Sequence, residues 1–329
     1  MFFCTISYRA ISRRPLALLL VGLAVCVAFV IYVVPMFYGT GRWEHYRSGG
    51  SFIGGSPSMS PDGSTIVYAS PRSGHGDIYR VNRDGSNTLR LTANPDCEAD
   101  PRYSPDGSKI VFVREEDNVG HVWIMNADGS GQQQLTNDPG DDNTPSFSTD
   151  GTQIVFMRYV RRSRFEDHSG RNAEIYTINS DGMGETRLTN NQDSDGPASF
   201  SPAGDHLVFG KTVSDMYGNV QDEIWLMDKD GRNATRLGLG SWPSFSPDRE
   251  HIMFLDDRTA DFQYDIYCMD SMGGNVSQIT STGGYKSDPS YCMGGDCVIF
   301  LDEPQARGVG MVTIVRLNDR TVEKVANTE

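Results

Sequence analysis

Apolar and polar residues alternate along most of this chain, and the alternation comes in blocks that recur six times. Each block has a short apolar stretch, Ser-Pro-Asp-Gly or a relic of it, an aliphatic run, an alternating aromatic run and then Asp-Gly. Alternation with a period of two places successive side chains on opposite faces, so these runs predict β-strands. The copies begin near residues 57, 101, 145, 198, 243 and 289, and their steps of 44 to 53 residues are typical of β-propeller blades.

The aliphatic runs predict central strands that are buried on both faces. In four copies the run ends in an aromatic side chain, at Tyr68, Phe112, Phe156 and Phe209. The Asp-Gly pairs supply the positive backbone φ angles that a tight hairpin requires. Four strands in each of six copies predict an all-β, six-bladed β-propeller over residues 52–329.

The Ser-Pro-Asp-Gly turn, with a downstream Ile-Tyr or Ile-Trp and Asp-Gly, resembles the WD-repeat-like blades of the TolB group over about residues 52 to 326. The resemblance implies a TolB-like propeller that holds a partner lipoprotein at the mouth of its channel. TolB proteins carry an α/β domain ahead of the propeller. Here only about fifteen residues separate an apolar segment from the first blade, so we expect a propeller without that domain.

That apolar segment, residues 15–38, has no charged side chain, and its part from Leu16 to Tyr38 would span about 34 Å as a helix at about 1.5 Å per residue. Three arginines precede it, so the positive-inside tendency predicts a cytoplasmic tail at residues 1–14. We expect a single-pass transmembrane helix, a linker at residues 39–51 and a periplasmic or extracellular propeller. A cleaved signal peptide is the alternative, although no Ala-x-Ala site follows the apolar core.

The charge balance excludes a general affinity for nucleic acids. The three arginines are the only charged side chains in the first forty residues, and the remainder carries 26 basic and 43 acidic side chains, a net charge of −17. A nucleic-acid-binding domain has a basic footprint instead. The acidity fits either the solubility of an exported domain or a field that steers a basic partner.

Two of the six cysteines occupy a special place in the repeat. Cys292 and Cys297 flank Met-Gly-Gly-Asp where the other copies have Ser-Pro-Asp-Gly, so they should face each other across a hairpin. A disulfide there would fix a turn that has lost its Pro-Asp. Cys97 and Cys268 belong to different copies and should be free, and no cysteine spacing makes a zinc site.

In a propeller, the loops that enter the innermost strands share one face with the loops that join the second and third strands. Acidic residues in the entry loops would ring the channel mouth there. They have two interpretations: hard oxygen ligands suit Ca²⁺, whereas aspartate before Pro or Gly often begins a turn. No other cofactor is expected. The predicted ring consists of Glu98, Asp100, Asp142, Asp195 and Asp288.

The third copy is longer than its neighbours by eight or nine residues, and the excess falls between its second and third strands. Arginines gather there, so this loop is a candidate contact for an anion or a partner. It could equally be a solvated loop that Glu166 and Asp167 partly neutralise. With two aromatic residues of neighbouring copies, the predicted partner-binding set is Arg158, Arg161, Arg162, Arg164, Arg171, Tyr217 and Trp242.

These features favour a membrane-anchored module that binds an envelope protein or peptide segment. No catalytic residue is predicted, because the chain contains no Gly-x-Ser-x-Gly and its six histidines form no metal-binding motif. The alternative is a carbohydrate-active lyase or hydrolase, which would deliver carboxylates and histidines to the central channel from separate blades. A third option is a purely structural domain of an envelope complex.

Overall fold

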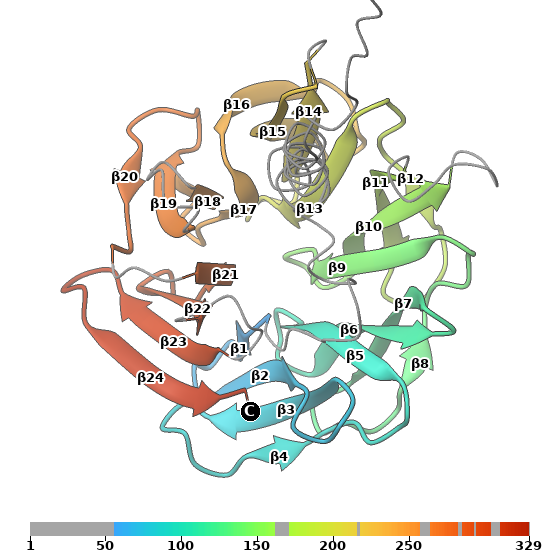
Figure 1. The fold of residues 1–329 in the computed structure, drawn as a ribbon, viewed down its shortest axis with the longest axis vertical. Coiled ribbons are helices and arrows are strands. Elements are labelled where there is room, and N and C mark those ends of the chain that lie inside the picture. Colours follow the sequence, from blue (N-terminus) through green and yellow to red (C-terminus); the bar gives the residue numbers. More distant parts are fainter. Residues whose placement is uncertain are drawn as a thin grey trace, which may run out of the picture. The chain divides into compact units, whose positions relative to one another are not determined.

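The computed structural model describes residues 56–161, 171–215, 218–256, 264–281, 285–292, 294–303 and 310–328, all within the unit Tyr46–Glu329. In these ranges the regular elements are β-strands, which form six four-stranded antiparallel sheets around a central axis (Figure 1). The predicted all-β, six-bladed propeller is confirmed. No helix in the described ranges is long and apolar enough to cross a bilayer, and the predicted tail, transmembrane segment and linker lie outside them.

Each blade consists of four strands that are consecutive in the sequence, with the first strand innermost (Figure 1). Blade 1 contains β1 (Ser58–Met59), β2 (Thr65–Ser70), β3 (Asp77–Asn82) and β4 (Leu89–Arg90). Blade 2 contains β5 (Cys97–Tyr103), β6 (Lys109–Glu116), β7 (Val119–Asn126) and β8 (Gln133–Gln134). Blade 3 contains β9 (Asp141–Phe147), β10 (Gln153–Arg161), β11 (Arg171–Asn179) and β12 (Thr186–Arg187).

The remaining three blades follow the same order. Blade 4 contains β13 (Ser194–Phe200), β14 (His206–Ser214), β15 (Val220–Asp228) and β16 (Thr235–Leu239). Blade 5 contains β17 (Ser241–Phe245), β18 (His251–Asp256), β19 (Asp265–Asp270) and β20 (Ser277–Gln278). Blade 6 contains β21 (Tyr285–Tyr291), β22 (Cys297–Glu303), β23 (Met311–Arg316) and β24 (Val322–Asn327).

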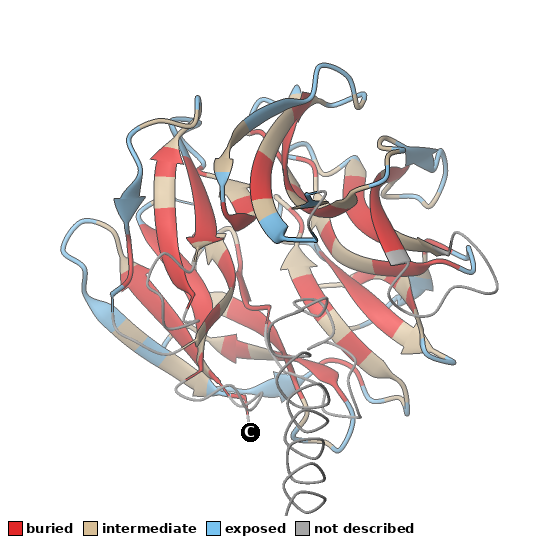
Figure 2. Ribbon diagram, turned by 45° about the horizontal axis from the view of Figure 1, so that its top comes forward, coloured by how far each residue is buried: buried red, intermediate tan, exposed pale blue. Residues whose placement is uncertain are grey.

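The core lies between the blades, where the second strands are buried on both faces (Figure 2). Phe112 and Phe156 on the central strands are fully buried, and Phe254 and Phe300 fill the same position in blades 5 and 6. One cluster joins Val111 of blade 2 to Phe156 of blade 3, and comparable clusters fill other gaps between neighbouring blades. Each sheet therefore depends on its neighbours for burial of its apolar faces.

The Ser-Pro-Asp-Gly sequence closes the turn between the first and second strands. In blade 2 the Ser104 hydroxyl donates to Asp106 Oδ1 at 2.6 Å, and the backbone N–H of Ser108 donates to the same oxygen. These hydrogen bonds, with the one from Ser104 foremost, lower the pKa of Asp106 to about 2, so its charge persists into acid. Equivalent serine–aspartate bonds occur at the same turn in blades 1, 3 and 5, whereas in blade 4, where Ala203 replaces the aspartate, Ser201 donates to Asp205 instead.

The Asp-Gly turns between the third and fourth strands have a second role that their sequence does not reveal. Gly129 and Gly231 have φ angles of +90° and +84°, as a tight turn requires. A Cβ atom on Gly231 would also lie 2.5 Å from the carbonyl oxygen of Leu188 in the preceding blade. Gly129 stands in the same relation to Leu91, at 2.8 Å. Glycine therefore permits both the turn and the close approach of adjacent blades.

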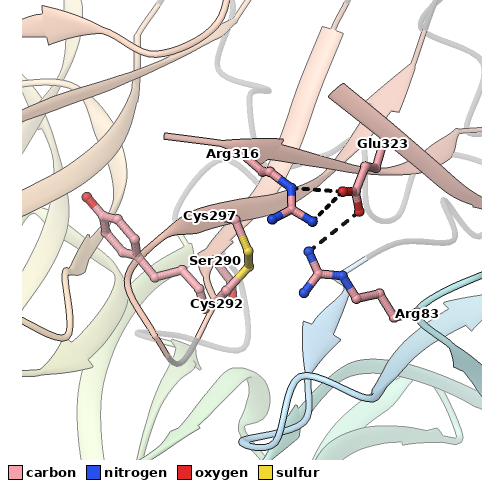
Figure 3. Close-up of a disulfide and its surroundings, with 7 residues drawn as sticks. Arg83, Ser290, Cys292, Cys297, Arg316 and Glu323 are labelled. Atoms are coloured by element: carbon pink, nitrogen blue, oxygen red, sulfur yellow. Dashed lines mark hydrogen bonds and ion pairs between the residues drawn. A yellow bond between two sulfur atoms is a disulfide. The ribbon is translucent and has the colours of Figure 1, made fainter. Parts of the chain in front are cut away.

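The ring closes where blade 6 meets blade 1, and among the described strands none is exchanged between these two blades. Cys292 and Cys297 form a disulfide across the turn between β21 and β22, with Cα atoms 5.3 Å apart (Figure 3). Both side chains are buried in a cluster that includes Met59 and Tyr68 of blade 1. Glu323 of β24 also receives hydrogen bonds from residues on both sides of the junction, Arg316 of blade 6 and Arg83 of blade 1 (Figure 3).

Replacing Gly231 with alanine should destabilise the propeller by about 2 to 4 kcal/mol, because it adds overpacking against blade 3 to the cost of a positive φ angle. Gly74 is the matched control, since its φ is +96° but a Cβ would meet nothing within 4 Å. Gly74→Ala should therefore cost only about 1 to 2 kcal/mol. Urea unfolding of both variants measures the difference, and equal costs would show that the contact between blades contributes nothing.

Candidate functional site

The two faces of the propeller differ in their connections. Because the strands of each blade are antiparallel, the turns between strands one and two and between strands three and four share one face, here called the turn face. The loops between strands two and three and the loops that enter the next blade share the opposite face, here called the loop face. All of the predicted partner-binding and ring residues belong to strands or loops at or near the loop face.

Three members of the predicted acidic ring lie inside the blades rather than around an open mouth. Each is fully buried and sits directly across from a cation on the second strand of its own blade. A buried carboxylate needs such a partner to remain charged. The expectation of an exposed ring is corrected for these residues. The pairs are Glu98–Arg114 at 3.0 Å, Asp142–Arg158 at 3.0 Å and Asp195–Lys211 at 3.3 Å.

Blade 6 contains the same pair with its charges reversed. Lys286 occupies the position of the inner carboxylate, and its ammonium lies 3.1 Å from Asp302 on the second strand. The cations of blades 2 and 3 also lie over aromatic rings of their third strands, with Arg114 4.1 Å from the centroid of Trp123. Sequence reasoning assigned Arg158 to partner binding and missed Arg114 and Lys211, although each of the three follows the central aromatic residue of its blade by two positions, as Arg114 follows Phe112.

The pair in blade 3 has a third member. The Arg158 guanidinium donates hydrogen bonds to Asp142 on one side and to Glu185 on the other, and its Nη1 lies 2.6 Å from Glu185 Oε1. Burial raises the pKa of Asp142 to about 6, against the hydrogen bonds from Arg158, which favour its ionised form. Burial disfavours charge on Arg158 as well, but its carboxylate partners outweigh this and raise its pKa, so the pair is ionised at neutral pH.

The other two ring residues, Asp100 and Asp288, occupy a bulge in the innermost strand. They are nearly fully buried, and their φ angles of +53° and +51° belong to the left-handed region that aspartate tolerates. The Asp100 carboxylate accepts hydrogen bonds from the Ser56 hydroxyl at 2.6 Å and from the Thr144 backbone N–H at 3.0 Å. It therefore ties together blades 1, 2 and 3, which is a structural task.

The predicted partner-binding residues separate into three groups. Arg158 belongs to β10 and is 2% exposed, so its pairing with Asp142 removes it from any surface contact. Trp242 is half-buried at the bulge of β17 and packs against the core between blades 5 and 6. Arg161 and Arg171 are the end residues of β10 and β11, and their side chains are not described. Arg162, Arg164 and Tyr217 lie outside the described residues.

The longest strands in the described part of the chain belong to the hairpins of blades 3 and 4. The strands β10, β11, β14 and β15 each have nine residues, β6 and β7 have eight, and β2, β3, β18 and β19 have six. The backbone register pairs Arg161 directly with Arg171 at the end of the blade 3 hairpin. In blade 4, Val220 is 47% exposed at the end of its hairpin.

Four of the carboxylates predicted to hold Ca²⁺ are engaged with protein groups, as described above: Glu98, Asp100, Asp142 and Asp195. One group in the described part of the chain brings three metal-ligand side chains together: Asp248, Glu250 and His251, on an exposed turn of blade 5 at the turn face. Asp248 already accepts hydrogen bonds from Ser246 and from the Glu250 backbone. That exposed group carries no metal assignment.

Comparison with known proteins supports the fold. A family model described as the Tricorn protease N-terminal beta propeller domain matches residues 73–219. An uncharacterised protein of Agrobacterium fabrum is 29% identical over 137 residues, which cover 37% of this chain and 45% of that protein. The chain thus spans less than half the length of this relative.

Two solved structures show the same architecture at low sequence identity. TolB from Acinetobacter baumannii has a TM-score of 0.65 and 22% identity, over 80% of this chain and 63% of that one. Oligogalacturonate lyase from Vibrio parahaemolyticus has a TM-score of 0.57 and 12% identity, over 82% of this chain and 76% of that one. The chain is TolB-like in fold, and an identity this low carries no statement about activity.

Reversing one charge of the Glu98–Arg114 pair should destabilise blade 2 by about 3 to 5 kcal/mol, because Glu98→Lys places two buried cations together. The double variant Glu98→Lys with Arg114→Asp reproduces the order of charges in blade 6, so it should recover about half of that loss or more. Urea unfolding of the single and double variants gives the coupling energy. Additive effects would mean that the two side chains do not stabilise each other.

Proposed function

We propose that this protein is a membrane-anchored, extracytoplasmic TolB-like propeller that binds a protein partner on its loop face. The observation that carries the proposal is the length of the blade 3 and blade 4 hairpins, whose nine-residue strands are the longest in the described part of the chain, with an arginine-rich segment joining β10 to β11. Loops held by a rigid scaffold are the usual place for recognition. The resemblance to TolB blades favours the same class of function.

The charge of this segment indicates the chemistry of the partner. Arg161, Arg162, Arg164 and Arg171 stand in a chain that is otherwise strongly acidic, and Arg158 is already satisfied by internal carboxylates. Guanidinium groups bind carboxylates through paired hydrogen bonds. We therefore expect the partner to present an acidic segment to blade 3 and an apolar contact to Val220 of blade 4.

The enzymatic alternative is less well supported. A lyase or hydrolase of this fold would need carboxylates and a histidine that face a common space. In the described ranges the inner carboxylates Glu98, Asp142 and Asp195 are paired with cations. The likeness to oligogalacturonate lyase rests on the fold alone, so we do not advance a substrate.

The anchor rests on residues 15–38, whose length and lack of charge suit a transmembrane helix. We expect the native protein to remain in the membrane pellet after extraction at alkaline pH, because peripheral proteins are released by that treatment and a spanning helix is not. Sequencing the N-terminus of the same fraction distinguishes the anchor from a cleaved signal peptide. Recovery of the propeller in the supernatant would contradict the anchor.

Replacing Arg162 and Arg164 with serine should reduce partner capture by about tenfold or more, since each lost charged hydrogen bond contributes roughly 1.5 to 3 kcal/mol. Capture is measured with a photo-crosslinker at Val220 in native membranes, followed by mass spectrometry. The matched control is Lys229→Ser with Arg232→Ser, which removes two cations from the turn face of blade 4. Equal capture by both variants would reject the arginine contact, and a crosslinker at exposed Met272 on the turn face should not capture the same partner.

A further inference from the structure

A groove of about 500 Å³ opens on the turn face between blades 2 and 3. Its apolar lining comes from Ile124 of β7 and Phe147 of β9, and carboxylates come from the turns of both blades, Asp106 and Asp150. Lys109 also lines the groove, and its ammonium donates a hydrogen bond to Asn126 Oδ1 of its own blade. The groove thus combines apolar surface with two acidic groups and one basic group.

The repeat shows what fills the same space one blade earlier. Arg80 of blade 1 and Ile124 of blade 2 occupy equivalent positions on the third strands of their blades. Arg80 directly follows Asp-Ile-Tyr, and Ile124 directly follows His-Val-Trp. The Arg80 side chain crosses the gap to blade 2, and its Nη1 donates to the carbonyl oxygen of Ala127 at 3.1 Å. The gap between blades 1 and 2 is therefore occupied by an internal guanidinium.

Two further differences open the gap between blades 2 and 3. In the earlier gap, the hydroxyl of Tyr103 lies 3.0 Å from Thr65 Oγ1, which joins the two walls. The equivalent residues around the groove are Phe147, which has no hydroxyl, and Lys109, which bonds to Asn126. The groove therefore lacks the arginine and this hydroxyl bridge.

The groups that accompany Arg80 are nevertheless retained. Ser180 stands where Ala127 stands, so its backbone carbonyl occupies the place of the acceptor used by Arg80. Asp106 and Asp150 stand on the two sides of the groove, as Asp62 and Asp106 stand on the two sides of the preceding gap. Hydrogen bonds from serine hydroxyls and turn N–H groups keep Asp106 and Asp150 ionised. A planar guanidinium on an apolar stem complements this combination of carbonyl, carboxylates and apolar lining.

We propose that the groove between blades 2 and 3 binds an arginine side chain presented by a protein partner. The arginine takes the place that Arg80 holds in the preceding gap, with its stem against Ile124 and Phe147 and its guanidinium toward Asp106, Asp150 and the Ser180 carbonyl. This site lies on the turn face, away from the hairpins that carry the proposed function, and does not depend on that function.

The test uses the full chain with ¹³C-labelled isoleucine methyl groups and N-acetyl-arginine methylamide as the probe. We expect a saturable shift of the Ile124 methyl resonance, with a dissociation constant on the order of millimolar for a single side chain. The citrulline derivative keeps the shape without the charge, and the lysine derivative keeps the charge without the planar fork. Both should bind about tenfold more weakly or not at all. No saturable shift, or equal binding of citrulline or lysine, would overturn the proposal.

Two variants locate the site independently. Ile124→Arg supplies the internal arginine of blade 1 and should abolish binding of the probe, monitored by thermal stabilisation. Arg80→Ile combined with Tyr103→Phe opens the preceding gap and should add a second site, reported by the methyl group that the substitution introduces. Because the second variant gains a site, it remains informative if Ile124→Arg does not fold. Failure to gain binding there would contradict the role assigned to the gap.

Discussion

The packing of twisted sheets against one another is the constraint on which this structure depends. Residues such as Phe112 and Phe156 are buried only because the adjacent blade covers them, and each contributes roughly 1.5 to 3 kcal/mol by leaving water. A blade alone would expose both of its apolar faces. The repeat therefore has to continue until the ring closes, and the closing contact must bury as much as the others.

That closing contact explains why the last blade departs from the repeat. Blade 6 has lost the Ser-Pro-Asp-Gly turn and has a disulfide between Cys292 and Cys297 in its place, against the apolar side chains of blade 1. Further hydrogen bonds cross the same junction: the Ser70 hydroxyl donates to the carbonyl oxygen of Thr328, and Arg72 donates to that of Asn327 in β24. Among the described residues no strand is shared between the two blades, so side-chain packing and these hydrogen bonds join them, while the disulfide fixes the turn of blade 6 that packs against blade 1.

The buried ion pairs divide the charged residues into structural and surface groups. Glu98, Asp142 and Asp195 are acidic residues in entry loops, yet each neutralises a cation of its own blade. Burying such charges singly would cost several kcal/mol per ion, so the two members of each pair depend on each other. The two surfaces that we propose for recognition lie elsewhere, at the long hairpins on the loop face and at the groove between blades 2 and 3 on the turn face.

The sequence by itself determined the architecture, because six copies of one pattern specify strands, turns and their number without reference to long-range contacts. It also placed the Cys292–Cys297 pair, since both residues flank a short turn and must lie close together. It could not show that Glu98 faces Arg114, sixteen residues away, because that pairing depends on the register and bulge of the innermost strand. The tertiary structure decided the burial of Arg158, the second role of Gly231 and the groove beside Ile124. The burial of Arg158 depends on carboxylates that two other segments of its own blade bring to it. The role of Gly231 and the groove depend on how one blade meets the next, and the separation of two blades in space is not encoded within either copy of the repeat.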